Sequence, residues 1–118
     1  MEYLPSVVAV TGELDLSSAT KWEEEVEEAV RSSPAVILDL SRVGFVDSAG
    51  VRALFTMLRA AQSRGAPMLF AAPRDGSVRR LLEILDLESV VPVCDSVEDA
   101  LRASRRAGRE ARPLTFRR

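Results

Sequence analysis

Ser48 is the residue whose type and position are best suited to chemistry. It follows Phe45-Val46-Asp47, where an apolar run ends, and precedes Ala49-Gly50, where an apolar pattern of helical spacing begins. A serine at the start of a helix is a favoured N-cap, because its hydroxyl accepts a backbone N–H of the first turn. The start of a helix also offers unpaired N–H groups and partial positive charge, which suit a phosphate. Ser48 is therefore either a helix cap or a site of phosphorylation.

Two acids, Glu13 and Asp15, lie at the end of another apolar run. In an open α/β sheet, functional residues gather where strands end and helices begin. Asp15 could cap the helix that begins near Ser17 or Ala19, which is a common use of aspartate. Alternatively, a carboxylate near Ser48 could position the hydroxyl or meet a basic residue of a partner. Both interpretations stay open for Asp15.

The sequence shows no machinery for catalysis at Ser48. It contains no histidine, the commonest general base and transition-metal ligand. Val46 stands where the nucleophile elbow of serine hydrolases needs its first glycine. A Gly-x-x-x-x-Gly-Lys phosphate loop is also missing, and the sole lysine, Lys21, lies in an acidic segment. We therefore predict that the protein is not an enzyme and uses no cofactor and no metal ion.

Strands and helices are expected to alternate along the chain. Short β-rich apolar runs predict strands at about 7–10, 35–40 with 45–46, 68–72 and 90–93. Apolar residues spaced by three and four predict helices at about 19–31, 48–64, 78–85 and 96–107. Helical crossovers return the chain in the same direction. We therefore predict an α/β fold of order β-α-β-α-β-α-β-α, with four helices packed against a single, mostly parallel sheet.

Three details of this pattern are specific enough to check. The predicted inner stripe of the second helix consists of apolar residues spaced by three and four, namely Val51, Leu54, Phe55, Leu58 and Ala61. Pro92 predicts that the last strand lies at an edge of the sheet, because proline cannot donate to a ladder. The segment Leu114-Thr115-Phe116 could add a small edge strand.

Composition indicates an ordinary globular domain with uneven charge. The 118 residues are 47% hydrophobic and carry a formal net charge of −2, which gives no overall attraction to nucleic acid or anionic lipid. No apolar run approaches the roughly 20 residues that span a bilayer, and the start of the chain lacks signal-peptide features. A single cysteine, Cys94, suits a reducing compartment and is expected in the core. We expect a cytoplasmic protein with a domain at 1–107 and a basic C-terminal tail at 108–118.

Two motifs in order resemble those of the STAS domain family. They are Thr11-Gly12-Glu13-Leu14-Asp15, followed by a helix and a buried strand, and then Phe45-Val46-Asp47-Ser48-Ala49-Gly50-Val51. The group that they resemble is the bacterial anti-sigma factor antagonists, and the resemblance runs from about Val7 to Ala107. It implies the same α/β fold and a regulatory role.

The resemblance also implies a mechanism. In such antagonists, the serine that corresponds to Ser48 is phosphorylated by a serine kinase that is also the anti-sigma factor, and a serine phosphatase restores the active form. The aspartate that corresponds to Asp15 takes part in partner contact. The implied docking surface consists of residues from both motifs and the start of the second helix: Glu13, Asp15, Asp47, Ser48, Ala49, Gly50, Val51 and Arg52.

The chain departs from the family pattern at two places. Many members have a glycine where this chain has Arg52, whose guanidinium could reach a phosphate, select a partner or simply face solvent. The family also has a strand before the first motif, for which only about six residues are present here. The open edge could pair with a second copy, giving a homodimer, or be filled by Leu114-Thr115-Phe116. The alternative function is a STAS subunit of a transporter or of a stress-sensing complex, acting as an assembly module.

Overall fold

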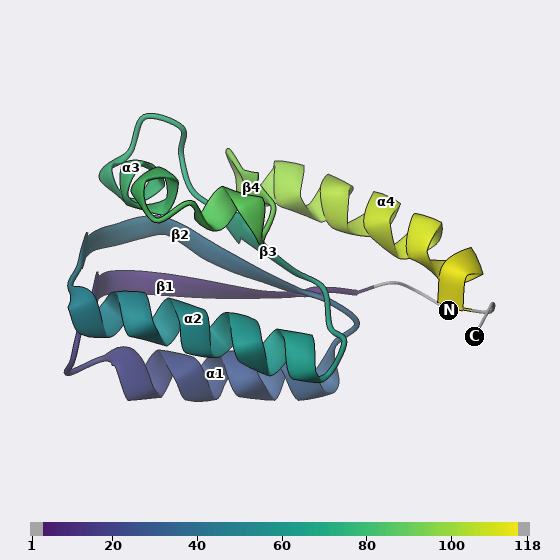
Figure 1. Ribbon diagram of the computed structural model, residues 1–118, viewed down its shortest axis with the longest axis horizontal. Coiled ribbons are helices and arrows are strands. Elements are labelled where there is room, and N and C mark those ends of the chain that lie inside the picture. The colour runs from purple at the N-terminus through teal and green to yellow at the C-terminus, as the bar shows by residue number, and fades with distance from the viewer. Residues whose placement is uncertain (1–3, 116–118) are drawn as a thin grey trace.

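The predicted alternation of strands and helices is present in the computed structural model, which describes the backbone of residues 4–115 and the side chains of residues 4–106. The elements follow in the order β1 (Ser6–Leu14), α1 (Ala19–Ser32), β2 (Val36–Val46), α2 (Ser48–Ser63), β3 (Met68–Ala71), α3 (Ser77–Ile84), the 3₁₀ turn η1 (Leu87–Ser89), β4 (Val93–Cys94) and α4 (Val97–Thr115) (Figure 1). The expected element order and the α/β class are confirmed.

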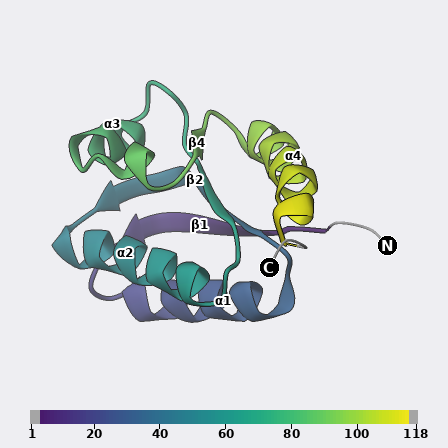
Figure 2. The same ribbon diagram turned by 45° about the vertical axis from the view of Figure 1, so that its right-hand side comes forward.

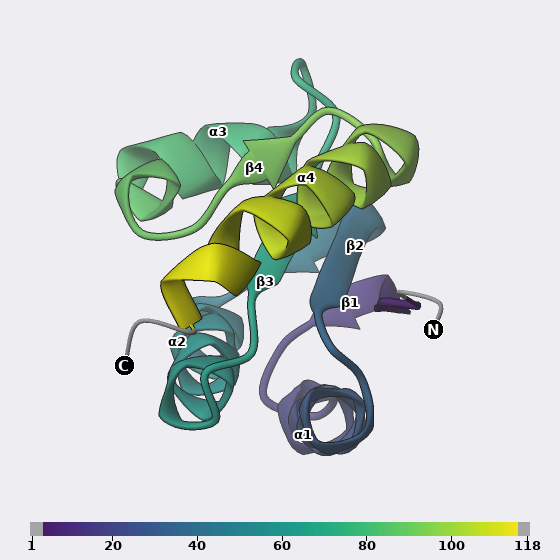
Figure 3. The ribbon, with the colours of Figure 1, turned by 90° about the vertical axis from the view of Figure 1, so that its right-hand side faces the viewer.

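The four strands form one parallel sheet in the order β1-β2-β3-β4. Each strand therefore pairs with its neighbour in sequence, and β1 and β2 reach the same end of the sheet. The predicted edge position of the last strand is confirmed, because β4 pairs with β3 alone in the described part of the chain. The strand itself is Val93–Cys94 and not residues 90–93, so Pro92 lies just before it. Figures 2 and 3 show α1 and α2 side by side against the sheet and α4 on its other side.

Alternating residues of β2 face two different hydrophobic clusters. Val36, Leu38 and Leu40 belong to the main core, which the buried residues of α1, α2 and α3 complete. Ile37 faces the opposite way, into a smaller cluster with Ala100 of α4. Helices on both faces thus explain why the sequence of β2 reads as a continuous apolar run.

β1 is longer than the apolar run at 7–10 predicted. It continues through Thr11 and Gly12 to Leu14, and its pairing with β2 shifts register between Ala9 and Thr11 and again between Gly12 and Glu13. Gly12 adopts a φ of 80°, a left-handed conformation that glycine tolerates without strain. At each shift the extra residue lies on β2, and the pairing of β1 continues, so Gly12 does not end the strand.

The last helix is also longer than expected. α4 continues past Ala107 to Thr115, although this segment contains Gly108 and Pro113, residue types that disfavour the interior of a helix. Leu114 and Thr115 are helical, so the suggestion that they add an edge strand is wrong; Phe116 lies outside the described residues. β1 pairs only with β2 within residues 4–115, and pairing of its free edge with a second copy stays a prediction.

Cys94 is half-buried beside the smaller hydrophobic cluster. Burial raises the pKa of its thiol, and the nearby carboxylate of Asp99 acts in the same direction. A thiol with a raised pKa stays protonated and unreactive near neutral pH. This agrees with Cys94 as a small packing residue.

Arg79 of α3 holds together the far half of the sheet. Its side chain is only 8% exposed, and its guanidinium donates to the carbonyl of Ala72 at 2.8 Å, to Asp95 at 3.0 Å and to Glu88 at 3.0 Å. One side chain therefore joins the end of β3, the η1 turn and the residue after β4. The hydrogen bond from Arg79 lowers the pKa of the Asp95 carboxyl, so this contact weakens only in strong acid.

We predict that Arg79→Met destabilises the protein by about 2 kcal/mol or more, because it leaves the buried Ala72 carbonyl without its donor. The measurement is the free energy of unfolding in urea. Arg80→Met is the matched control: Arg80 is exposed on the same helix, and its removal should change stability by no more than about 0.5 kcal/mol. Equal effects of the two substitutions would refute the assignment.

Candidate functional site

Ser48 is the first residue of α2, but it does not cap that helix. The N-cap is Asp47, which has extended backbone and whose Oδ1 accepts the backbone N–H of Gly50 at 2.9 Å. The interpretation of Ser48 as the cap is therefore wrong, because the helix begins at Ser48 itself, one residue earlier than that role requires. Ser48 is exposed, and within the described residues its hydroxyl makes no hydrogen bond. The hydroxyl is free to meet another molecule.

Asp15 organises the turn between β1 and α1. Its Oδ1 accepts hydrogen bonds from the Ser17 hydroxyl at 2.8 Å, the Ser17 N–H at 3.0 Å and the Ser18 N–H at 3.2 Å. The bond from the Ser17 hydroxyl is the main cause that lowers the pKa of Asp15. Asp15 thus closes the turn that precedes α1, whereas the N-cap of α1 is Ser18, so the interpretation of Asp15 as the helix cap is wrong. This arrangement leaves an ionised carboxylate at the surface, because the side chain is not buried.

The two motifs meet because their strands are neighbours. Glu13 and Leu14 of β1 pair with Phe45 and Val46 of β2, and the N–H of Asp47 donates to the Leu14 carbonyl at 3.3 Å. The β1–α1 turn and the start of α2 therefore lie at the same end of the sheet. The backbones of the two motifs are therefore neighbours, whereas a contact between the Asp15 carboxylate and Ser48 stays a prediction.

Gly50 makes this approach tight. A Cβ atom at this position would lie 2.0 Å from the carbonyl oxygen of Leu14 and 2.9 Å from Cγ1 of Val46. No side chain fits at such a distance, so only glycine allows α2 to begin directly against β1. The family resemblance implied that Gly50 belongs to the docking surface. In the structure Gly50 is buried, and its role is to let the start of α2 lie against β1.

Two apolar side chains of the site escaped the sequence analysis. Leu16, in the turn after β1, is 78% exposed, and Phe45, near the end of β2, is 55% exposed. Strand alternation places Phe45 on the same side as the buried Val43, so no sequence signal marks it as a surface residue. Beside Phe45 a groove of about 270 Å³ is lined by Gly44, Phe45 and Val46 and by the α3 residues Ser77, Val78 and Leu81.

Charge is arranged unevenly around Ser48. Glu13 and Asp15 make one side acidic, whereas Arg52 lies exposed one helical turn beyond Ser48. No group of acidic, cysteine or histidine side chains that could hold a metal ion occurs among the described residues. The chain contains no histidine that could activate the serine. The arrangement is suited to presenting a hydroxyl to another protein, with apolar contacts next to it.

Comparison with known proteins agrees with this fold and site. The STAS domain model matches residues 3–100. The anti-sigma-F factor antagonist RsfB of Mycobacterium tuberculosis is 31% identical over 102 residues, which cover 85% of this chain and 81% of that protein. The crystal structure of an anti-sigma factor antagonist from Mycobacterium paratuberculosis superposes with a TM-score of 0.74 at 30% identity and covers 84% of each chain.

A sulfate transporter family protein from Wolinella succinogenes has a TM-score of 0.68 at 17% identity, over 85% of this chain and 84% of that one, and this likeness shows the fold alone. No helix in the described part of the chain is long and apolar enough to cross a membrane. The chain belongs to the STAS domain family, in its anti-sigma factor antagonist group.

We predict that Gly50→Ala destabilises the protein by about 3 kcal/mol, because the new methyl group collides with the backbone of Leu14. Gly44→Ala is the matched control, since a Cβ there would have only the Gly12 carbonyl oxygen within reach, at 3.9 Å. Urea unfolding of the two variants measures the difference. Similar stabilities for both would show that α2 begins farther from β1 than the structure places it.

The assignment of the cap leads to a second prediction. Asp47→Ala should cost about 1 kcal/mol of unfolding free energy, because it removes the acceptor for the Gly50 N–H. Ser48→Ala should cost no more than about 0.5 kcal/mol, since the hydroxyl has no partner in the described structure. Thermal and urea unfolding can both measure this. The reverse order of the two costs would restore Ser48 as the cap.

Proposed function

We propose that the unmodified protein binds an anti-sigma factor that is also a serine kinase, and that phosphorylation of Ser48 by this kinase ends the binding. The observation that carries the proposal is the free hydroxyl of Ser48. Because Asp47 supplies the cap, Ser48 can accept a phosphoryl group without losing any hydrogen bond that holds α2. The modification changes the surface while the fold stays intact.

The proposed docking surface combines the two motifs that the sheet brings together. Glu13 contributes from the end of β1 and Asp15 from the turn after it. Ser48 and Arg52 contribute from the exposed side of α2. Asp47 and Gly50 act from beneath, by capping α2 and by allowing its close approach to β1. Ala49 and Val51 are half-buried and add apolar contact at the edge of the surface.

The phosphoryl transfer needs a base that the chain does not supply. The Ser48 oxygen would attack the γ-phosphorus of ATP held by the kinase, and ADP would leave. Without a histidine in the sequence, the hydroxyl proton would pass to a base of the kinase. This division assigns the catalysis to the partner and leaves the present chain as a substrate and a ligand, not an enzyme.

The phosphate would weaken binding through its charge and its hydration. It adds about −1.5 to −2 charges at neutral pH, beside the carboxylates of Asp47 and Asp15. A penalty of about 3 kcal/mol at this contact would weaken the affinity by about 100-fold. A serine phosphatase would hydrolyse the phosphoester and restore the hydroxyl. Since the kinase consumes ATP, the proposed exchange of partners belongs to the cytoplasm.

We predict that the kinase transfers labelled phosphate from ATP to the wild-type protein but not to Ser48→Ala. The kinase is the one purified from the source cells by this transfer reaction. Ser63→Ala is the matched control, because Ser63 is an exposed serine at the opposite end of the same helix. Tryptic mass spectrometry would locate the phosphate. Labelling of Ser48→Ala at the wild-type level would refute the proposed site.

Calorimetry with the same kinase tests whether phosphorylation of Ser48 weakens binding. Protein synthesised with phosphoserine at position 48 should bind about 100-fold more weakly than unmodified protein, whereas phosphoserine at position 63 should change affinity little. Equal affinity of the unmodified and position-48 phosphorylated proteins would refute the switch. Binding to a membrane transporter with no phosphorylation would favour the role of a transporter subunit.

A further inference from the structure

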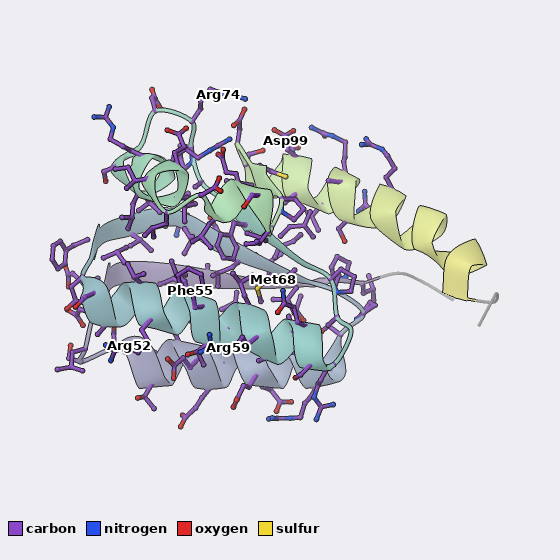
Figure 4. All side chains as sticks on the ribbon, in the orientation of Figure 1. Arg52, Phe55, Arg59, Met68, Arg74 and Asp99 are labelled. Carbon is purple, nitrogen blue, oxygen red and sulfur yellow. The ribbon has the colours of Figure 1, made fainter. Side chains whose placement is uncertain are left out.

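The outward face of α2 carries a stripe of residues that begins at Ser48. Ser48, Arg52, Phe55 and Arg59 are spaced by four, three and four residues, so they lie above one another on one side of the helix. The buried residues Gly50, Ala53, Leu54, Met57, Leu58 and Ala61 form the opposite side. Figure 4 shows Arg52, Phe55 and Arg59 along α2. We call these four residues the α2 stripe.

Phe55 does not lie in the core, although its spacing predicted an inner position. It is 36% exposed, because the buried side of α2 is centred on Leu54, Met57 and Ala61 and Phe55 falls outside it. An exposed Phe55 can contact another protein, and an aromatic side chain supplies a large contact area at a low cost in conformational entropy. Phe55 lies between two arginines of the same stripe.

The charge of the α2 stripe is of one sign. α2 contains no aspartate or glutamate, and Arg52 and Arg59 form no ion pair with any residue of the described structure. The nearest polar contact of the Arg59 guanidinium is a long one, 3.5 Å to the hydroxyl of Thr56. By contrast, the exposed face of α1 carries Glu24, Glu25, Glu27 and Glu28. Both arginines are therefore available to carboxylates of another molecule.

We propose that the α2 stripe is a docking strip for the anti-sigma factor, and that the partner meets it with an acidic surface around an apolar contact for Phe55. This inference rests on the proposed function, and it extends the contact surface from Arg52 to Phe55 and Arg59. The strip is continuous with Ser48, so a partner that covers the hydroxyl also reaches Arg52. A partner surface with carboxylates on both sides of an apolar patch would place its carboxylates against Arg52 and Arg59 and its apolar patch against Phe55.

The uneven charge on the two sides of Ser48 also determines how the partner is oriented. Glu13 at the end of β1 and Asp15 in the turn after it would attract a cationic region of the partner. Arg52 and Arg59 would attract an anionic region of the partner. Only one orientation of the partner satisfies both. A phosphate on Ser48 would compete with the partner's carboxylates for Arg52, which is four residues away on the same helix. Phosphorylation would thereby occupy Arg52, so that only Arg59 of the two stripe arginines stays available to the partner.

A second copy of the chain fits the α2 stripe less well. In a two-fold dimer the same patch meets itself, which brings arginine against arginine. The acidic face of α1 from another copy is complementary in charge, but α1 and α2 lie beside each other in one chain. Contact between them would join unlike surfaces head to tail, which builds a ring or a filament and not a two-fold dimer. The charge pattern therefore favours a different protein.

The test measures affinity for the kinase purified through Ser48 phosphorylation, by calorimetry and by surface plasmon resonance. The variant Arg52→Glu/Arg59→Glu should bind at least about tenfold more weakly than the wild type, and Phe55→Ala should lose about tenfold. Arg59→Lys should keep most of the affinity, because it retains the charge. The association rate of the wild type should fall as salt rises from about 0.05 to about 0.3 M, and that of the double variant should depend less on salt.

Arg105→Glu is the matched control, because it reverses an exposed charge on α4, on the other side of the sheet. Unchanged thermal unfolding shows that each variant is folded; if the double variant is not, Arg59→Ala replaces it and should lose about threefold or more. Wild-type affinity in the α2 variants, with an intact Ser48 switch, would overturn this inference alone. Self-association of the wild type that these variants abolish would also overturn it, in favour of a second copy. Failure to recover from the source cells any kinase that phosphorylates Ser48 would instead refute the proposed function.

Discussion

The close approach between Gly50 and the carbonyl of Leu14 is the constraint on which the site depends. The two backbones come so near that a side chain at position 50 would have no room. This contact sets the distance between the start of α2 and the end of β1, and with it the distance between Ser48 and the acidic turn. Because β1 and β2 are parallel, the segments that follow them lie at the same end of the sheet. The absence of a Cβ atom at Gly50 further allows the two segments to lie in contact and form a continuous surface.

Asp47 and Ser48 have separate roles at the start of α2, so the proposed modification of Ser48 need not lower the stability of the fold. Asp47 satisfies a backbone donor of the first turn of α2, which is a structural role. Ser48 follows it and has no such role, so the proposed phosphorylation would break no hydrogen bond that holds α2. If the serine itself were the cap, each phosphorylation would alter the bond that holds the helix end. Placing the cap one residue earlier separates the structural function from the proposed regulatory one.

The rest of the domain keeps this surface rigid while leaving it accessible. α1, α2 and α3 complete the main core on one face of the sheet, and α4 covers a smaller cluster on the other. Arg79 joins β3, η1 and the end of β4 with a single guanidinium, far along the sheet from β1. Among residues 4–106, the exposed side chains of α2 take no part in either buried cluster or in an ion pair. An unpaired basic and aromatic stripe can persist there because the stability of the fold comes from the opposite side of the helix.

The sequence by itself determined the class of fold, the order of its elements and the two motifs of the site. Apolar periodicity and strand-like runs are local properties, and they predicted the parallel sheet because crossover helices leave little choice of direction. The tertiary structure alone decided which residue caps α2, that Gly50 is buried against Leu14, and that Phe45 and Phe55 are exposed. Each of these depends on which atoms of distant segments lie nearby, and a pattern along one chain contains no such distances. The same reason applies to Arg79, whose three acceptors come from separate parts of the chain and meet only after folding.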